Sequence, residues 1–185
     1  MAATNASTQH GASMIEVLVT LVIIAFGLLG MAGLQARLQL SELEAYQRTQ
    51  ALMLVNDMAA RISTNRLNAS SYVTGTTYGS NMTCPTTTAT TVQRDLTEWC
   101  NALQGASEAT GSTKQGAMIG GRGCVQSISG DYMVTVAWQG MTPLAAPPSS
   151  VTCGANEYDG STGAKCVSDL CRRVVTTIVR IGSLT

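Results

Sequence analysis

Residues that could carry enzyme chemistry are sparse in this chain of 185 residues. Its one histidine, His10, lies close to the first residue, and the eleven Asp and Glu residues are scattered along the sequence. Most hydrolytic mechanisms need a nucleophile beside its base or a pair of carboxylates, and imidazole is the usual base. If the first residues are removed, no histidine remains for a catalytic or metal-binding role. We therefore expect a protein that is not an enzyme and that uses no cofactor or metal.

The second group of reactive side chains is a set of six cysteines, all beyond residue 83: Cys84, Cys100, Cys124, Cys153, Cys166 and Cys171. An even count without a C-x-x-C motif is typical of disulfides in an oxidising compartment, and the spacings suit an all-cysteine metal site poorly. The count alone leaves several pairings open. We favour a bond between Cys84 and Cys100, which would pin the threonine-rich loop 83–91 to a following helix. The other four cysteines would brace a sheet and its C-terminal loop.

The chain contains an apolar run of twenty residues without a charge, Val17–Ala36. At about 1.5 Å per residue, a helix of this length is about 30 Å long, the thickness of a bilayer core. A buried core helix seldom stays apolar for so long. A secretory signal peptide has a shorter apolar region flanked by positive charge and a cleavage site, whereas no Lys or Arg precedes this run. The run therefore predicts a membrane-spanning helix.

One carboxylate, Glu16, stands at the head of the apolar run. A carboxylate in lipid costs several kcal/mol unless a cation pairs with it. Alternatively, Glu16 lies at the membrane surface and stays hydrated. If the chain is cut after Gly11, Ala12 becomes a free ammonium four residues before this carboxylate. An amine and a carboxylate would then share one helix end, and each could also pair with the opposite charge of a neighbouring subunit.

The segment 11–19, GASMIEVLV, resembles the prepilin signature of type IV pilins and type II secretion pseudopilins. The resemblance implies that a prepilin peptidase cuts after Gly11 and N-methylates Ala12. It also implies that Glu16, at the fifth mature position, neutralises the terminal amine of an adjacent subunit during filament assembly. The chain departs from the family in having Ala12 where phenylalanine is usual and in lacking basic residues in the leader.

The helix is predicted to continue beyond the membrane, from Ala12 to about Asn65, since no proline precedes Pro85. Apolar residues at helical spacing support this, because they form one stripe along the helix: Leu34, Leu38, Ala51, Val55, Met58 and Ile62. Two predicted ion pairs, each between residues four positions apart, are expected on its solvent-exposed side: Glu44–Arg48 and Asp57–Arg61. Three glycines in the apolar half are either ordinary membrane-helix residues or positions for close helix packing: Gly27, Gly30 and Gly33.

Beyond Leu67 the sequence predicts a small mixed head. A short helix has four residues on one face: Leu96, Trp99, Cys100 and Leu103. Residues 111–123 contain five glycines and predict a flexible connection. A hairpin follows, with strands 124–128 and 132–139 around a turn at 129–131. Its second strand points one set of side chains at the long helix: Tyr132, Val134, Val136 and Trp138. The β-branched segment 172–181 predicts a third strand.

The expected fold class is α+β. The family resemblance implies the type IV pilin fold, in which a long N-terminal helix packs its second half on a small antiparallel sheet. We divide the chain into a prepilin leader at 1–11, a transmembrane and polymerisation helix at 12–36, an amphipathic continuation at 37–67 and a disulfide-braced head at 68–185.

Three head segments also resemble PilV minor pilins: RDLTEWCNAL at 94–103, YMVTVAWQG at 132–140 and CRRVVTTIVRI at 171–181. The resemblance implies a low-abundance subunit of a tip complex that helps prime and cap a type IV pilus, related to the I-type pseudopilin of type II secretion. The implied partners are other minor pilins, the major pilin, the prepilin peptidase and the inner-membrane assembly platform. The implied location is the inner membrane as a precursor and then the pilus at the cell surface.

Two kinds of ligand could bind the head, nucleic acid and Ca²⁺. Basic residues near its end could contact DNA in a pilin that captures DNA for uptake: Lys165, Arg172, Arg173 and Arg180. The net charge of zero favours a solvated strand edge over nucleic acid. Three acidic residues could hold Ca²⁺, but they lack the spacing of an EF-hand: Glu157, Asp159 and Asp169. We expect neither nucleic acid nor a metal as the ligand.

Overall fold

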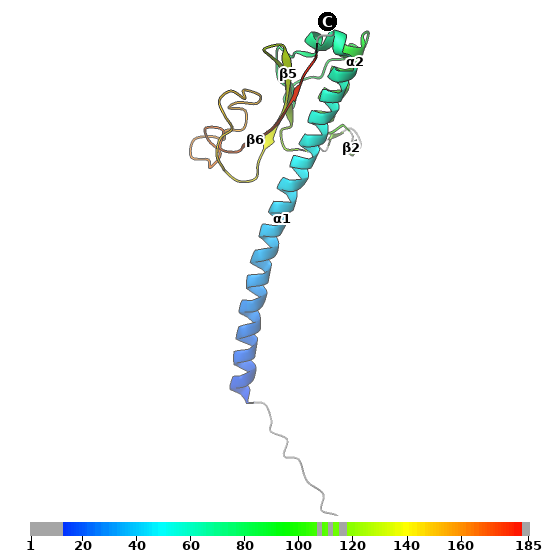
Figure 1. Cartoon of the computed structure of the whole chain (residues 1–185). Coiled ribbons are helices and arrows are strands. Elements are labelled where there is room, and N and C mark those ends of the chain that lie inside the picture. Colours follow the sequence, from blue (N-terminus) through cyan, green and yellow to red (C-terminus); the bar gives the residue numbers. More distant parts are fainter. Residues whose placement is uncertain (1–12, 107–108, 111–112, 115–117, 183–185) are drawn as a thin grey trace, which may run out of the picture. The chain divides into compact units, whose positions relative to one another are not determined.

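The computed structural model describes residues 13–106, 109–110, 113–114 and 118–182. The chain divides into two compact units, Met1–Glu42 and Leu43–Thr185. The helix α1, Met14–Thr64, begins in the first unit and ends in the second (Figure 1). The predicted long N-terminal helix is therefore confirmed. Its expected first residue, Ala12, lies outside the described residues.

In the first unit, every described side chain of α1 is exposed. Leu34 and Leu38, the first two residues of the predicted stripe, are among these exposed residues. The buried residues of α1 are all later in the helix: Gln47, Ala51, Val55, Met58 and Ile62. The stripe is thus confirmed only in the second unit, where other elements are available to cover it.

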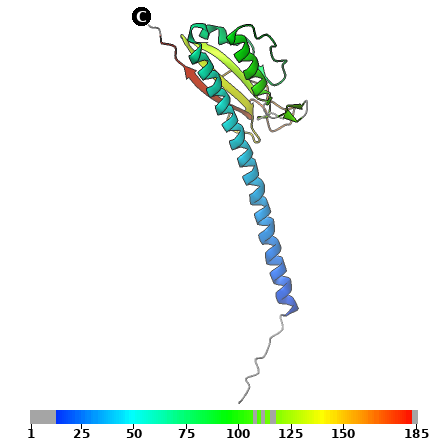
Figure 2. The ribbon, with the colours of Figure 1, turned by 90° about the vertical axis from the view of Figure 1, so that its right-hand side faces the viewer.

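The second unit, which we call the head, contains the end of α1 and all other elements. These are the 3₁₀ helix η1 (Arg66–Tyr72), β1 (Tyr78–Gly79), α2 (Thr91–Leu103), β2 (Ala109–Thr110), β3 (Thr113–Lys114), β4 (Arg122–Ile128), β5 (Asp131–Gln139) and β6 (Arg172–Val179). An antiparallel sheet has the order β1-β4-β5-β6, and β2 and β3 form a separate two-stranded ribbon (Figure 2). The α+β class is confirmed.

One hydrophobic core joins the end of α1, α2 and one face of the sheet. The strand β5 contributes the residues predicted to face the helix, of which Val134, Val136 and Trp138 are buried and Tyr132 is half-buried. α1 contributes four buried side chains: Ala51, Val55, Met58 and Ile62. Full burial of a large aliphatic or aromatic side chain stabilises the fold by about 1.5–3 kcal/mol, so these residues fix α1 to the sheet.

The short helix α2 buries the face that was predicted: Leu96, Trp99, Cys100 and Leu103. It begins at a capping box, in which the Thr90 hydroxyl accepts from the Gln93 N–H and the Gln93 side chain accepts from the Thr90 N–H. It ends before Gly105, whose φ of 76° is the left-handed conformation common after a helix. Both ends are therefore set by local sequence.

The hairpin differs from its prediction at the turn. Asp131 belongs to β5 and pairs with Ile128, so only Ser129 and Gly130 lie in the turn. Both have positive φ, 51° and 94°, which matches the right-handed twist of the two strands. The last strand, β6, is confirmed but ends at Val179 rather than at residue 181.

Gly123 was predicted to belong to a flexible glycine-rich connection at 111–123, and this is wrong. The residue lies within β4, facing α2. A Cβ at this position would stand 2.3 Å from the Trp99 Cη2 atom and 2.7 Å from a Leu103 methyl group. Here glycine allows the helix to approach the sheet closely.

Candidate assembly helix and head surface

The carboxylate of Glu16 stands at the exposed beginning of α1. The Glu16 N–H donates to the Ser13 carbonyl oxygen at 2.9 Å, and the Val17 N–H donates to the same oxygen at 3.3 Å. A carboxylate in the first turn also interacts favourably with the helix dipole. Gly11 and Ala12, the predicted cleavage and methylation positions, lie outside the described residues. Glu16 is thus placed where it can meet a charge from outside the described chain.

Apolar side chains surround the following turns of α1 on all sides. Leu18, Ile23 and Phe26 are all exposed, although each would be buried in a soluble core. The hydroxyl of Thr20, a polar group in this segment, donates to the Val17 carbonyl oxygen at 2.8 Å. Within the described residues, α1 is the one helix long and apolar enough to cross a membrane. An exposed apolar surface of this size is typical of a segment that lipid or other apolar helices cover.

The three glycines of this segment have no packing partner in the described chain. A Cβ added at Gly27, Gly30 or Gly33 meets no atom within 4 Å. Close approach within the chain therefore does not explain these glycines, in contrast to Gly123. Both earlier interpretations, a tolerated membrane-helix residue and a site of close helix packing, stay open.

Two polar side chains of α1 attach the helix to loops of the head. The buried Gln47 accepts a hydrogen bond from the Ile119 N–H at 3.1 Å. Glu44 accepts from the Met141 N–H at 3.0 Å and lies 3.6 Å from the Arg173 guanidinium. Among the ion pairs of the described residues, the predicted Glu44–Arg48 pair is absent. Glu44 instead joins α1 to the loop that follows β5 and to the beginning of β6.

The other predicted pair, Asp57 with Arg61, is confirmed at 2.9 Å and is part of a larger cluster. The Arg61 Nη1 atom also lies 2.9 Å from Asp95 and 2.7 Å from Glu98, both on α2. Burial lowers the pKa of Arg61, but its hydrogen bonds to Glu98 and Asp95 outweigh this and raise the pKa. The Tyr72 hydroxyl donates to Asp95, and burial together with this bond raises the tyrosine pKa. The cluster joins α1, η1 and α2.

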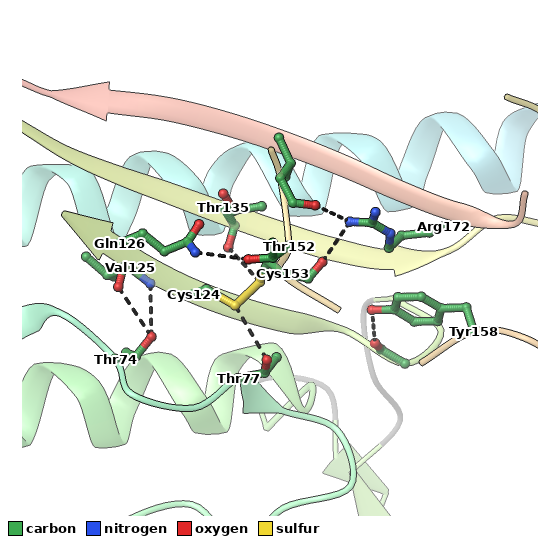
Figure 3. Close-up of a disulfide and its surroundings, with 12 residues drawn as sticks. Thr74, Thr77, Cys124, Val125, Gln126, Thr135, Thr152, Cys153, Tyr158 and Arg172 are labelled. Atoms are coloured by element: carbon green, nitrogen blue, oxygen red, sulfur yellow. Dashed lines mark hydrogen bonds between the residues drawn. A yellow bond between two sulfur atoms is a disulfide. The ribbon is translucent and has the colours of Figure 1, made fainter. Parts of the chain in front are cut away.

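All six cysteines form disulfides, in the pairs Cys84–Cys100, Cys124–Cys153 and Cys166–Cys171. The first is the pairing favoured from the sequence, and it ties the threonine-rich loop to α2. The second ties β4 to the loop that covers the face of the sheet opposite α1 (Figure 3). The third closes a short loop just before β6. Three disulfides in a head of this size are typical of an oxidising compartment.

Arg172, a candidate DNA contact, is only 3% exposed. Its Nη1 atom donates to the carbonyl oxygens of Val151 at 2.7 Å and Cys153 at 3.1 Å (Figure 3). Its Nη2 atom lies 3.0 Å from the Asp169 carboxylate. The guanidinium therefore fastens a loop to β6 and is not available to nucleic acid, which corrects its proposed role.

The remaining basic residues do not restore a DNA patch. Arg173 donates to the carbonyl oxygens of Thr142 at 2.6 Å and Leu170 at 3.2 Å, so it too holds loops in place. Lys165 is exposed, and Arg180 lies 3.7 Å from Asp131 with 82% of its side chain exposed. Two of the four predicted contacts are thus structural.

The acidic residues considered for Ca²⁺ are also engaged with protein groups. Glu157 lies 2.8 Å from the Arg122 Nη2 atom, and Asp159 accepts from the Asp169 N–H at 2.9 Å. Asp169 is bound to Arg172. In the part of the chain that the structure describes, no group of three His, Cys, Asp or Glu side chains could hold a metal ion.

Sequence reasoning missed a buried contact between Arg122 and Tyr158. The Arg122 guanidinium lies 4.9 Å from the centre of the tyrosine ring, and the Tyr158 hydroxyl donates to the Gly120 carbonyl oxygen at 2.9 Å. Burial raises the pKa of Tyr158 to about 12, although the Arg122 charge opposes the shift. No sequence pattern marks this contact, because its partners lie on a strand and a distant irregular loop.

The chain matches no protein-family model, no curated protein and no solved structure. Its function must therefore be inferred from Glu16, the exposed apolar segment of α1 and the disulfide-linked head.

Proposed function

We propose that this chain is a minor pilin, a PilV-like subunit with the type IV pilin fold that helps prime and cap a type IV pilus within a tip complex. The observation that carries the proposal is the position of Glu16. It is a carboxylate in the first turn of a helix whose following turns are apolar on every side and exposed.

The physical argument rests on the cost of an unpaired charge. At the head of an apolar segment, Glu16 is stable when a cation neutralises it. Cleavage after Gly11 would create such a cation at Ala12, four residues before the carboxylate. In a bundle of these helices, the carboxylate of an entering subunit can pair with the amine of its neighbour. The apolar surfaces of the helices then bury one another.

The head supports the same proposal. Its three disulfides suit the periplasm and the cell surface, while the apolar segment suits the inner membrane before assembly. Other minor pilins, the major pilin, the prepilin peptidase and the inner-membrane assembly platform are the partners of this proposal. The subunit needs no catalytic group of its own.

Replacing one carboxylate tests the proposal. Glu16→Gln keeps the side chain's shape but removes its charge, so we expect at least a tenfold loss of the chain from sheared surface filaments. Glu42→Gln is the matched control, because Glu42 is exposed on the same helix outside the apolar run, and it should assemble normally. Immunoblots of filament and membrane fractions measure both. Equal incorporation of the two variants would contradict the assembly role of Glu16.

A type II secretion pseudopilin is the alternative, since the segment 11–19 suits both filaments. Deletion of the chain separates the two: a minor pilin is needed for surface pili, whereas a pseudopilin is needed for protein secretion. A pilus-displayed DNA-binding subunit has less support, because Arg172 is buried and Arg173 is bound by the head.

A further inference from the structure

The two edges of the head's sheet differ. At one edge, β1 is only two residues long, Tyr78–Gly79. At the other edge, β6 is eight residues long and pairs on one side only, with β5. Within the described residues, 173–179 make no backbone hydrogen bond outside this pairing. One side of β6 therefore presents free N–H and C=O groups.

The open edge lacks the usual protection against pairing. Natural edge strands are commonly guarded by charges, proline, bulges or short length. Residues 174–179, VVTTIV, are six consecutive β-branched residues without a charge, glycine or proline. The charges at the start of the strand do not guard it, since Arg172 is buried and Arg173 is bound to Glu44 and to loop carbonyls. A strand of this composition is well suited to extending a sheet.

Side chains along the edge indicate what could pair with it. Ile178 is 54% exposed, and two residues further along the same face Arg180 is exposed with only a 3.7 Å contact to Asp131. A neighbouring strand would cover Ile178 with an apolar side chain and would place a carboxylate near Arg180. The edge therefore fits an extended, β-branched segment that carries an acidic residue.

A second copy of the chain fits less well. Two β6 edges can continue one sheet in antiparallel fashion only through a two-fold axis perpendicular to it. The residues brought together in that pairing would come from 173–180, which contain no Asp or Glu. Neither copy would therefore supply a carboxylate for the other copy's Arg180.

We propose that the free edge of β6 binds an extended strand of a different protein, with an Asp or Glu of that strand facing Arg180. The interface rests on the proposed function and deepens it, since it assigns a head surface for the tip partner. Main-chain hydrogen bonds would supply affinity, and Ile178 and Arg180 would supply register and selectivity.

Site-specific photo-crosslinking of the full chain in its native cells tests this proposal. A p-benzoylphenylalanine replaces Ile178 on the edge or, as a matched control, Ile128, which is 41% exposed on β4 and is separated from β6 by β5. We expect an adduct at 178 at least fivefold above that at 128, mapped by mass spectrometry to one acidic, extended segment of another protein. Arg180→Glu should reduce the adduct several-fold, whereas Lys165→Glu, the same charge change outside β6, should not.

Equal yields at 178 and 128, no adduct at 178, or an adduct to a second copy of this chain would each overturn the proposal. The N-terminus of the chain is sequenced from the same membranes. A processed N-terminus with no adduct at 178 would reject the edge interface alone. An adduct at 178 on a chain that still begins at Met1 would support the interface and reject the pilin assignment.

Discussion

The two parts of α1 differ in the exposure of their apolar side chains. Before Glu42 they are exposed, as with Leu18 at 62%, whereas in the head one stripe of them is buried, as with Val55 at 1%. The sequence shows the reason. The first part is apolar around its whole circumference, while the second has an apolar stripe flanked by mostly polar residues. One helix can therefore serve two environments, and the stability of the head should depend only on the second part.

The largest effect on the head is expected from its buried arginine. Arg172→Ala removes three contacts and leaves the Asp169 carboxylate and two carbonyl groups without their partner. We expect a loss of about 3–5 kcal/mol in the free energy of unfolding. Denaturant unfolding of the full chain in detergent measures it. The exposed Arg180→Ala is the control and should change the value by less than about 0.5 kcal/mol. Similar values for both would refute the structural role of Arg172.

A glycine of the head and a glycine of the exposed part of α1 should respond differently to the same change. Gly123→Ala pushes a methyl group into Trp99 and should cost about 1–3 kcal/mol, or more if the strand cannot shift. Gly30→Ala meets no atom and adds a better helix former outside the head, so head unfolding should not change. Near-ultraviolet circular dichroism during urea unfolding reports on both. Equal midpoints for the two variants would show that α2 does not pack closely on β4.

A smaller effect concerns Tyr158. Its pKa of about 12 in the folded head exceeds the ordinary tyrosine value of about 10, so the folded state holds the phenol proton more tightly. The resulting stability is complete below pH 10 and is lost as the pH rises from about 10 to about 12. Tyr158→Phe should cost about 1 kcal/mol at pH 8, from its lost hydrogen bond, and should flatten the alkaline decline. An unchanged alkaline slope in the variant would contradict the burial of this hydroxyl.

Much of the fold follows from local patterns. The helix, the hairpin and the last strand were predicted because apolar spacing and β-branched residues are local signals. The Cys84–Cys100 bond was found because a short loop separates its partners. In each case a few neighbouring residues carry the information.

Contacts between distant residues could not be predicted in this way. Glu44 was assigned to Arg48 because both lie on one helix, yet it binds loop and strand residues about a hundred positions away. Arg172 was predicted to be a surface charge, because the neighbouring sequence does not show that the loop containing Val151 and Cys153 folds over it. Gly123 suggested flexibility because the sequence does not show that Trp99 stands against it.

The central claim is that the exposed apolar part of α1 is a processed assembly helix. Its most direct test is the intact mass and N-terminal sequence of the chain purified from sheared surface filaments. The account predicts a chain that begins at methylated Ala12 and carries three disulfides. A chain that begins at Met1, or one cut beyond residue 33, would contradict it.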